Sequence, residues 1–471
     1  MIRELPAMPV LSLQFDAMRA ASRRDQYPAW AVRADRLRRL RALVLDNQPA
    51  IAEAIDADFT QRPRQETALL EVFPSLAGID DALRHGKRWM RMRRARTGFW
   101  FLPGRSRLLP QPLGVIGIVV PWNYPLYLAV GPLAGALAAG NRAMVKLSEY
   151  TPRFAALFEA LIRRTFAPDE VAVVNGDAEV ARQFCTLPFD HLLFTGSTAV
   201  GHEVMRAAAT HLTPVTLELG GKSPAIVGPD ADLDQAVERI LVGKLVNAGQ
   251  TCIAPDYVLV PHAQRERFVQ AAIRCAARLY PDLARNADYT SIVSARHFTR
   301  LQSMVGAAEA AGARRVALTD AVPDAAARRF PPELLLDVPD EAMAMREEIF
   351  GPVLPVVGYD SLDAAIAYVN ARPRPLALYV FDRRREHLDA VTRQTVAGGV
   401  TVNDTLFHIA QDDLPFGGVG ASGMGVYHGE AGFDTFSKRK PIFLQSRLNG
   451  AGLLKPPYGR RFEAMLKLLI R

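Results

Sequence analysis

Apolar residues recur at helical spacing through the first part of the chain. Over residues 11–58 they return at intervals of three, four and seven, with Arg and Asp between them, as at Leu37, Leu40 and Val44. The same spacing continues over residues 64–95. This is the period of an amphipathic helix that buries one face, so both stretches are predicted to be helical.

After residue 112 the pattern changes to short apolar runs that alternate with helical stretches. The run LGVIGIVVP, which begins at Leu113, is typical of a strand buried on both faces. The runs AMVKL, VAVVNG, HLLFTG and VTLEL follow it, and most are separated by helical patterns. Repeated units of this length predict a Rossmann-like, doubly wound parallel sheet, which binds nucleotides at the carboxyl ends of its strands.

A second α/β series begins near Ser223, directly after the double glycine Gly220-Gly221. Two other segments are rich in aromatic and basic residues and suit an exposed hairpin and strand rather than core. The chain ends in FEAMLKLLIR, which is predicted to be a helix. The expected domains are a nucleotide-binding domain of residues 1–97 and 113–219, a catalytic domain of residues 220–425, oligomerisation segments at 98–112 and 426–446, and a C-terminal tail of residues 447–471.

Composition narrows the classes of protein that the chain can represent. Its 471 residues exceed what one hydrophobic core organises, and 49% hydrophobic with 23% charged residues is ordinary for a globular protein. The net charge is +8, but the basic residues are scattered and no basic groove with interleaved aromatics is visible, so no nucleic-acid partner is expected.

Cysteine usage and hydropathy indicate the compartment. Cys185, Cys252 and Cys275 are the only cysteines, too few for a disulfide framework. The first residues lack a signal-peptide pattern, and no run of about 18 apolar residues occurs. We therefore expect a cytoplasmic protein with no membrane partner.

Three polar residues stand in contexts suited to catalysis. Cys252 lies in NAGQTCIAPD, where backbone N–H groups can hold a thiolate, although a lone cysteine is more often a small buried side chain. Glu218 ends an apolar strand in TLELGGKSP, as a general base or a structural ion-pair partner. Asn123 follows the first buried strand in VVPWNYP, as an oxyanion donor or a turn residue. Taken singly, these alternatives stay open.

Two glycine-containing segments are candidates for phosphate binding. FTGSTAVG follows a strand and opens a helix, so Gly196 and Ser197 lie where a helix N-terminus can hold a phosphate. The segment from Gly418 to Gly423 has the GxGxxG spacing. It follows LPFG rather than a buried strand, however, and no βαβ unit comes after it. We interpret that segment as a flexible loop.

The motifs together resemble one superfamily across essentially the whole chain. PWNYP, KLSE, FTGSTAVG, LELGGKSP, GQTC, EEIFGPV and LPFGGVGASGMG occur in this order, and Glu218 precedes Cys252 by 34 residues. This arrangement resembles the aldehyde dehydrogenase superfamily. The short N-terminal region and the tail VYHGEAGFDTFSKRK resemble its dimeric class 3 branch, and within that branch the chain is most similar to the coniferyl aldehyde dehydrogenases.

The resemblance implies a role for each motif. Cys252 would be the nucleophile, Glu218 the general base, and Asn123 the oxyanion donor together with the backbone N–H of Cys252. The chain has KLSE where the family often has a KPSE-type motif, which leaves the spacing of the lysine and the glutamate unchanged. No metal is implied. The residues implied for NAD and/or NADP are Pro121, Trp122, Lys146, Glu149, Gly196, Ser197, Val200, Gly201, Glu348 and Phe350.

The chemistry of the reaction explains this set. An aldehyde has no leaving group except hydride, so a nucleophile such as a thiolate must add first. The resulting thiohemiacetal gives up hydride to a nicotinamide cofactor, and water activated by Glu218 hydrolyses the thioester. One alternative is an acylating enzyme that passes the acyl group to coenzyme A, which Glu218 argues against. Another is a cofactor-independent thiol esterase, which would need a histidine such as His408.

Substrate and assembly are less specified by the sequence. Tyr124, Tyr127, His408 and Phe436 are candidate walls for a flat aldehyde such as coniferyl aldehyde, or for a medium-chain aliphatic one, and they fit a core position equally well. Two apolar segments, residues 98–112 and 433–444, are poor monomer surface. The family's hairpin and C-terminal strand join subunits, so a homodimer is expected.

Overall fold

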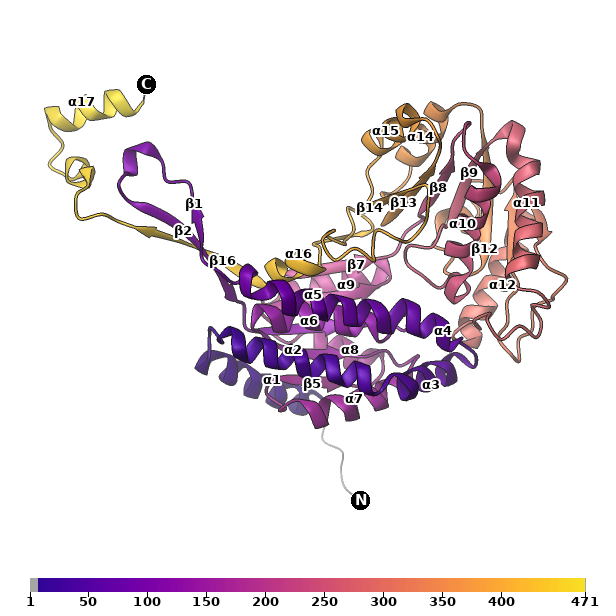
Figure 1. Ribbon diagram of the computed structural model, residues 1–471, viewed down its shortest axis with the longest axis horizontal. Coiled ribbons are helices and arrows are strands. Elements are labelled where there is room, and N and C mark those ends of the chain that lie inside the picture. Colours follow the sequence, from indigo (N-terminus) through magenta and orange to yellow (C-terminus); the bar gives the residue numbers. More distant parts are fainter. Residues whose placement is uncertain (1–6, 471) are drawn as a thin grey trace, which may run out of the picture.

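The computed structural model describes residues 7–470, which form three β-sheets (Figure 1). Helices cover two of the sheets, and the third projects from the body of the molecule as an arm. The α/β class predicted from the sequence is confirmed.

The helical N-terminal region is divided more finely than its periodicity predicted. Pro28 precedes α2, where Ala29 is extended, and Pro49 lies in the first turn of α3, where a missing N–H costs little. The second stretch ends at Trp89, and its last residues form a strand instead. The elements are α1 (Ala7–Arg24), α2 (Trp30–Asp46), α3 (Gln48–Phe59), α4 (Arg64–Thr67), the π-helical turn η1 (Ala68–Val72), α5 (Phe73–Trp89) and β1 (Arg93–Ala95).

The first sheet has the strand order β15-β7-β6-β3-β4-β5, and all pairs are parallel except β15 with β7. With its first strand at the centre, this order is that of a dinucleotide-binding fold, whose ligand lies where the order reverses, between β3 and β6. The strands are β3 (Val115–Val119), β4 (Arg142–Lys146), β5 (Val171–Val174), β6 (His191–Gly196), β7 (Val215–Leu219) and β15 (Gly423–Met424). The helices between them are α6 (Tyr127–Ala139), α7 (Pro152–Thr165), α8 (Ala178–Cys185) and α9 (Thr198–Ala209).

The second sheet has the order β10-β11-β12-β9-β8-β13-β14, with only β10 antiparallel to its neighbour. Its strands are β8 (Pro224–Val227), β9 (Tyr257–Pro261), β10 (Arg314–Ala317), β11 (Glu333–Leu336), β12 (Val353–Tyr359), β13 (Ala377–Phe381) and β14 (Gly399–Val402). Its helices are α10 (Leu233–Leu245), α11 (Arg265–Leu279), α12 (Ala295–Ala310), α13 (Met343–Arg346), α14 (Leu362–Asn370) and α15 (Arg385–Gln394). The chain passes from the first sheet to the second at the double glycine singled out in the sequence.

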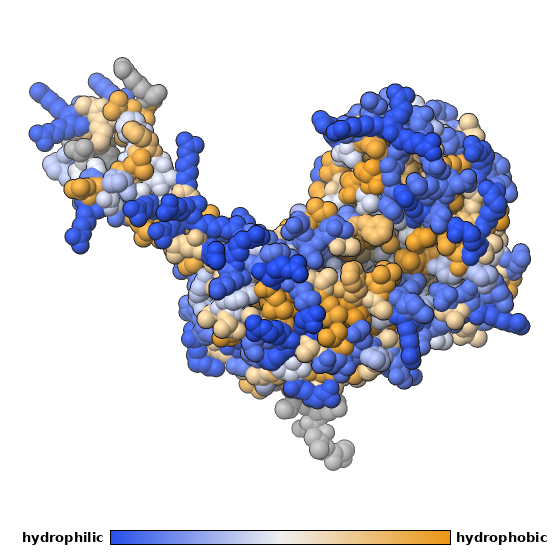
Figure 2. Space-filling model, in the orientation of Figure 1, coloured by the Kyte–Doolittle hydropathy of each residue, from blue (hydrophilic) through white to orange (hydrophobic). Residues whose placement is uncertain are grey.

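The arm consists of β1, β2 (Arg105–Pro112) and β16 (Ser437–Leu444), followed by the turn η5 (Gly450–Leu454) and α17 (Arg460–Leu469). The short helix η2 (Phe99–Phe101) forms the tip of its hairpin, and the three side chains are more than half exposed. Figure 2 shows the arm standing apart from the body, with apolar side chains at its end. No helix within residues 7–470 is long and apolar enough to cross a bilayer.

The glycine-rich segment before α16 (Gly429–Thr435) is not the flexible loop that we expected. It includes β15, where Gly423 pairs with Glu218 of β7 and has a φ of +135°. A Cβ there would lie 2.0 Å from the backbone oxygen of Leu217, so a side chain is excluded. The glycines therefore bring this segment, which belongs to the predicted catalytic domain, back onto the first sheet.

Candidate active site

Several predicted site residues meet at the carboxyl edge of the first sheet. The segment Pro121–Asn123 follows β3, and Thr195 lies in β6, the neighbouring strand. Glu218 lies in β7, where the register places it directly beside Thr195. Because parallel strands end at the same edge of a sheet, the topology itself brings these side chains together.

Cys252 reaches this edge from the second sheet, on the loop that follows α10. Three successive residues of that loop have positive φ: Asn247 at 52°, Ala248 at 51° and Gly249 at 73°. A Cβ on Gly249 would lie 2.3 Å from the backbone oxygen of Gly351, so only glycine fits there. Each non-glycine residue in such a conformation costs about 1–3 kcal/mol, so tertiary contacts must hold the loop.

Asn247 supplies those contacts. Its side-chain amide donates hydrogen bonds to the backbone oxygens of Asn123 and Gln250, both at 3.1 Å. Its backbone N–H donates to the Glu66 carboxylate at 3.1 Å. The loop of the nucleophile is thereby tied to the segment that follows β3.

A buried ion pair supports the same segment and was missed by the sequence analysis. Arg62 and Glu71 are fully buried and lie 2.8 Å apart. Arg62 also donates to the backbone oxygen of Asn123 at 3.0 Å, and Glu71 accepts from the N–H of Leu126 at 2.7 Å. In the sequence, Arg62 lies between the two predicted helical stretches and Glu71 lies in the second, and both charges could equally have been on the surface.

Cys252, Asn123 and Glu218 line one cavity of about 210 Å³. Glu348 and Phe350 line it as well. Its remaining wall is largely aromatic or aliphatic, and includes Trp122, Leu128, Phe416 and Tyr427. Phe416 and Tyr427 belong to the motifs LPFGG and VYHGE, to which the sequence analysis gave no role in the site.

The four side chains predicted to contact substrate do not line this cavity: Tyr124, Tyr127, His408 and Phe436. Tyr124 is hydrogen-bonded to the hydroxyl of Thr251 (2.6 Å), and Tyr127 to the imidazole of His428 (3.1 Å). His408 is hydrogen-bonded to the hydroxyl of Thr401 (2.9 Å), and the ring of Phe436 packs against that of His191, with centroids 5.5 Å apart. Phe436 is completely buried, so for this residue the alternative of a core position describes the structure.

Burial determines the protonation of the two central groups. Glu218 is 2% exposed, and neither of its carboxylate oxygens has a hydrogen-bond partner among the described residues, so its pKa is raised well above 4.5. Burial also raises the pKa of the Cys252 thiol, and the Glu348 and Glu218 carboxylates raise it further. Hydrogen bonds from two backbone N–H groups lower this pKa, but by less than the other effects raise it. The sequence led us to expect a stabilised thiolate; these surroundings favour the thiol, which needs a base to remove its proton.

Glu348 approaches the cavity across the double glycine. A Cβ on Gly220 would lie 1.9 Å from a carboxylate oxygen of Glu348, so this approach requires the glycine. Burial and the nearby Asp256 carboxylate raise the pKa of Glu348 to about 8. A second carboxyl that is partly protonated near neutral pH therefore stands in the same cavity.

A groove of about 980 Å³ adjoins the cavity and has the features of a dinucleotide site. It runs between α8 and α9 to the strand ends, and shares Pro121, Trp122, Thr195, Gly196 and Ser197 with the cavity. The helix α9 begins in it, and a helix N-terminus presents backbone N–H groups that bind phosphate. Lys146, Glu149 and Val200 also line the groove.

Two details of the groove depend on particular residues. The Ser197 hydroxyl accepts a hydrogen bond from the N–H of Val200 at 3.4 Å and so caps α9. A Cβ on Gly201 would lie 2.7 Å from the Leu219 side chain, so this glycine lets α9 pack closely on β7. The Lys146 ammonium donates to the backbone oxygens of Leu147 (2.5 Å) and Gly176 (2.8 Å), and burial lowers its pKa.

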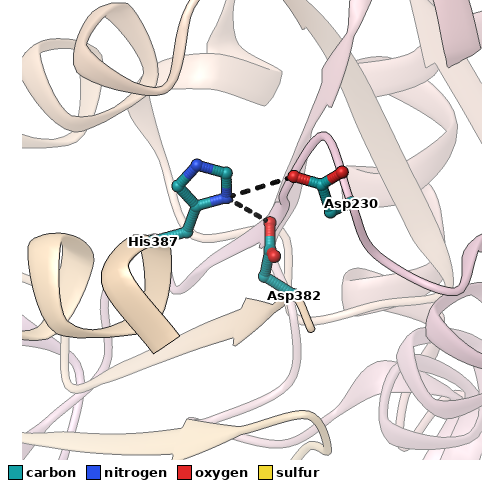
Figure 3. A group of neighbouring side chains, drawn as sticks. All are labelled: Asp230, Asp382 and His387. Atoms are coloured by element: carbon teal, nitrogen blue, oxygen red, sulfur yellow. Dashed lines mark hydrogen bonds and ion pairs between the residues drawn. The ribbon is translucent and has the colours of Figure 1, made fainter. Parts of the chain in front are cut away.

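One cluster outside the cavity has metal-ligand residue types (Figure 3). His387 Nδ1 lies 3.0 Å from an Asp382 carboxylate oxygen and 3.7 Å from one of Asp230. Arg384 lies 3.9 Å from Asp230, and its backbone N–H donates to Asp382 at 2.7 Å. Because cationic and N–H partners already engage these carboxylates, we interpret the cluster as an ion-pair network.

Comparison with known proteins gives a consistent family. The Aldehyde dehydrogenase family matches residues 13–442. A protein of Pseudomonas aeruginosa named probable coniferyl aldehyde dehydrogenase is 50% identical, over 98% of this chain and 96% of its own length. Aldehyde dehydrogenase family 3 member A2 of Mus musculus is 41% identical, over 95% of this chain and 91% of its own.

Solved structures share the fold. The substrate-bound state of Staphylococcus aureus AldH has a TM-score of 0.92 and 37% identity, covering 98% of this chain and 99% of that one. An aldehyde dehydrogenase of Mycobacterium tuberculosis, complexed with NAD+, has a TM-score of 0.83 and 29% identity, covering 94% and 91%. The resemblance to the superfamily and to its class 3 branch is thereby confirmed.

Proposed function

The chain belongs to the aldehyde dehydrogenase family and is an NAD(P)-dependent oxidoreductase that oxidises aldehydes, and we propose that Cys252, Asn123 and Glu218 carry out the reaction. The observation that carries this proposal is that these three side chains line one cavity, which adjoins the dinucleotide groove.

Cys252 adds to the carbonyl carbon of the aldehyde. Because the buried thiol holds its proton, a base must remove it first, and Glu218 is a carboxylate of the same cavity without a hydrogen-bond partner among the described residues. Burial raises the pKa of both groups, which keeps the carboxylate basic enough for the thiol. The addition forms a thiohemiacetal on Cys252.

Asn123 stabilises the negative charge that develops on the carbonyl oxygen. Its backbone oxygen is held by Arg62 and Asn247, so the position of the residue is set before substrate enters. Its side-chain amide lines the cavity, and the backbone N–H of Cys252 is the second donor. One oxyanion donor of this kind is worth about 2.7–4 kcal/mol.

The cofactor bound in the groove supplies the acceptor for the hydride. Lys146 and Glu149 would hold it near the adenosine ribose and the segment Gly196 to Gly201 along the phosphates, and of that segment Gly196, Ser197 and Val200 line the groove. Glu348 and Phe350 would hold it from the adjoining cavity. Their positions fit the predicted roles, since the groove passes from α8 to the strand ends beside Cys252.

Glu218 completes the cycle by hydrolysis. Loss of hydride leaves a thioester on Cys252, and Glu218 takes a proton from the water that attacks its carbonyl carbon. The carbon–sulfur bond breaks, the carboxylic acid leaves, and the Cys252 thiolate takes back a proton from Glu218 to restore the thiol. A buried carboxyl with raised pKa suits this step because it accepts a proton from water more readily than an exposed one.

We infer that the substrate is a flat aldehyde such as coniferyl aldehyde. The cavity beside Cys252 has an aromatic wall of Trp122, Phe416 and Tyr427, and such walls favour conjugated rings. The relative of 50% identity, named probable coniferyl aldehyde dehydrogenase, supports the same class. A panel of cinnamyl-type and medium-chain aliphatic aldehydes tests this, and an aliphatic preference in kcat/KM would contradict it.

The decisive experiment separates hydride transfer from hydrolysis. In Glu218→Gln, rapid mixing with aldehyde and NAD should give a burst of NADH that is slower than in the wild type, because the Cys252 thiol loses its base. The steady state that follows should be at least about 100-fold slower than in the wild type, because hydrolysis loses its general base as well. Glu333→Gln is the matched control, because Glu333 is equally buried but lies in β11, away from the cavity. A wild-type steady state in Glu218→Gln would remove Glu218 from this role.

A further inference from the structure

A second, smaller chamber lies behind the catalytic cavity. It is enclosed by α5, α6 and α16, which pack against one another at the base of the arm (Figure 1), and its volume is about 30 Å³. A volume of this size holds about two water molecules. Tyr427 lines both this chamber and the catalytic cavity, so the two spaces share a wall.

The chamber is lined by polar atoms that the protein leaves without partners. Four of them are buried with no hydrogen-bond partner among residues 7–470: Ser75 Oγ, Trp89 Nε1, His428 Nδ1 and the Tyr427 hydroxyl. An unpaired buried polar group costs about 1–3 kcal/mol, and buried water is the usual remedy when several such groups converge. An apolar cavity would stay dry, whereas this one has four unpaired polar atoms among its lining residues that can bind water.

The chamber also has an outer end. Asp412 lines it and is partly exposed, and burial together with the Asp81 and Asp413 carboxylates raises its pKa to about 6. Tyr127, on the same wall, shares a hydrogen bond of 3.1 Å with His428. Polar side chains thus line the chamber from the Tyr427 phenol, shared with the catalytic cavity, to a titratable carboxyl that is partly exposed.

The proposed reaction needs such a path. Glu218 receives one proton from the thiol and another from the attacking water in each turnover, and only one of them returns to the Cys252 thiolate. The carboxyl is buried with no hydrogen-bonded neighbour among the described residues to take the other. Tyr427 is the one residue of the cavity wall that also lines the chamber. The phenol is also within electrostatic reach of Glu218 and Cys252, which raise its pKa in addition to burial.

We propose that the chamber holds two ordered waters and that protons leave Glu218 through Tyr427 into it. Neither the Glu218 oxygens nor the Tyr427 hydroxyl has a hydrogen-bond partner among the described residues, so a water in the catalytic cavity bridges the two groups. That water takes the Glu218 proton and gives one to the phenol oxygen while the phenolic proton passes to a chamber water, so Tyr427 stays neutral. The water passes a proton on to Asp412 and so to solvent. This relay rests on the proposed role of Glu218 and assigns Tyr427 as a positioning and relay residue for hydrolysis.

The first test removes the phenolic oxygen. Tyr427→Phe keeps the ring, so the NADH burst should survive while the steady-state rate falls about tenfold, a part of what acid–base catalysis contributes. The solvent deuterium isotope effect on the steady state should rise, and Tyr427→Phe should add nothing to Glu218→Gln in a double-mutant cycle. Tyr359→Phe is the matched control, because the buried phenol of Tyr359 donates a hydrogen bond of 2.7 Å to the backbone oxygen of Val227, within the second sheet.

The second test concerns the chamber itself. A crystal structure at high resolution should show two waters bonded to Ser75, Trp89 and His428. Ser75→Val fills the space and should slow hydrolysis as Tyr427→Phe does, whereas Ser75→Ala leaves room for water and should not; melting temperatures identify any variant that is simply misfolded. A dry chamber, or a wild-type steady state and isotope effect in Tyr427→Phe, would overturn the relay. If Glu218→Gln shows its burst in that case, the proposed function stands and only the relay fails.

Discussion

The side-chain amide of Asn247 donates to the backbone oxygen of Asn123 over 3.1 Å, and this bond joins the loop of the proposed nucleophile to that of the proposed oxyanion donor. Asn123 follows β3 of the first sheet, whereas Asn247 follows α10, a helix of the second sheet. Asn247 holds a left-handed conformation, with a φ of 52°, to make the contact. Strain of this kind persists only where surrounding contacts fix it, and here those contacts set the distance between Cys252 and Asn123.

Replacing Asn247 should therefore weaken both fold and catalysis. Asn247→Ala removes the amide and leaves an alanine at positive φ without the hydrogen bonds that hold the asparagine there. The loss in free energy of unfolding should be about 1–3 kcal/mol. Asn247→Gly removes the same amide but tolerates the backbone, so it should recover part of the melting temperature and none of the turnover. If both variants kept the wild-type kcat, the bond would have no role in positioning.

Cys252→Ala should abolish dehydrogenase turnover while cofactor binding survives. The reason is that Cys252 lines the cavity, whereas the thiol of Cys275 lies on α11 outside it. Turnover is followed by NADH absorbance and binding by quenching of tryptophan fluorescence. Cys275→Ala is the control and should retain activity; loss of activity there with retention in Cys252→Ala would assign the nucleophile to the wrong residue.

Glu218→Gln should stabilise the protein even as it slows hydrolysis. Burial raises the pKa of Glu218 above 4.5, so the folded state binds its proton more tightly than the unfolded state does. The resulting penalty is absent below about pH 4.5 and grows as pH rises toward the folded pKa. The gain in melting temperature of Glu218→Gln over the wild type should thus be larger at pH 8 than at pH 5, and a gain independent of pH would contradict this origin.

The sequence was sufficient for the sheets because their strands are continuous apolar runs separated by helical periods. It located Cys252, Glu218 and Asn123 because each lies in a distinctive motif beside a strand end or a glycine. It did not locate Arg62, Glu66 and Glu71, since charged residues in a helical stretch or in the connection before it fit a solvated surface as well as a buried position. Only the packing of α4 and η1 against the active-site loops shows that these charged residues are buried and not on a solvated face.

The residues that form the wall of the cavity could not be predicted from the sequence either. Phe416 and Tyr427 lie in segments with no regular period, and their place depends on how β15 returns to β7. Phe436 is also an aromatic residue in this part of the chain, but it lies in the core, where its ring packs against that of His191. Aromatic type alone does not distinguish a wall from a core, because both bury the ring.

The enzyme should use both NAD and NADP. Glu149 is exposed in the groove and favours the free ribose hydroxyls of NAD, while Lys146 is buried with two backbone oxygens as partners. Glu149→Gln removes the repulsion of a 2′-phosphate and should move the ratio of dissociation constants about tenfold toward NADP, or 1.4 kcal/mol. Fluorescence titration with NADH and NADPH measures this. A wild-type preference beyond about a thousandfold would contradict a shared pocket.

The arm should join two copies of the chain. Residues 90–112 and 437–470 carry 14 basic side chains and one acidic one, so the rest of the chain has a net charge of −5 although the whole has +8. β16 is the outer strand of the arm and β14 the outer strand of the second sheet, and each offers a free edge for strand addition. A cationic arm with exposed Trp100 and Leu444 fits the acidic body of a second copy.

Light scattering at low micromolar concentration decides between a dimer and the 51.7 kDa monomer. Because the complementarity is partly between exposed charges, the dimer should weaken between 0.05 and 0.5 M salt, where the Debye length falls from over about 10 Å to under about 8 Å. The pair Trp100→Glu and Leu444→Glu should shift the population to monomer, whereas Val322→Glu, at a still more exposed apolar position off the arm, should not. A monomer with full activity would exclude this assembly, and a tetramer would require a second interface outside the arm.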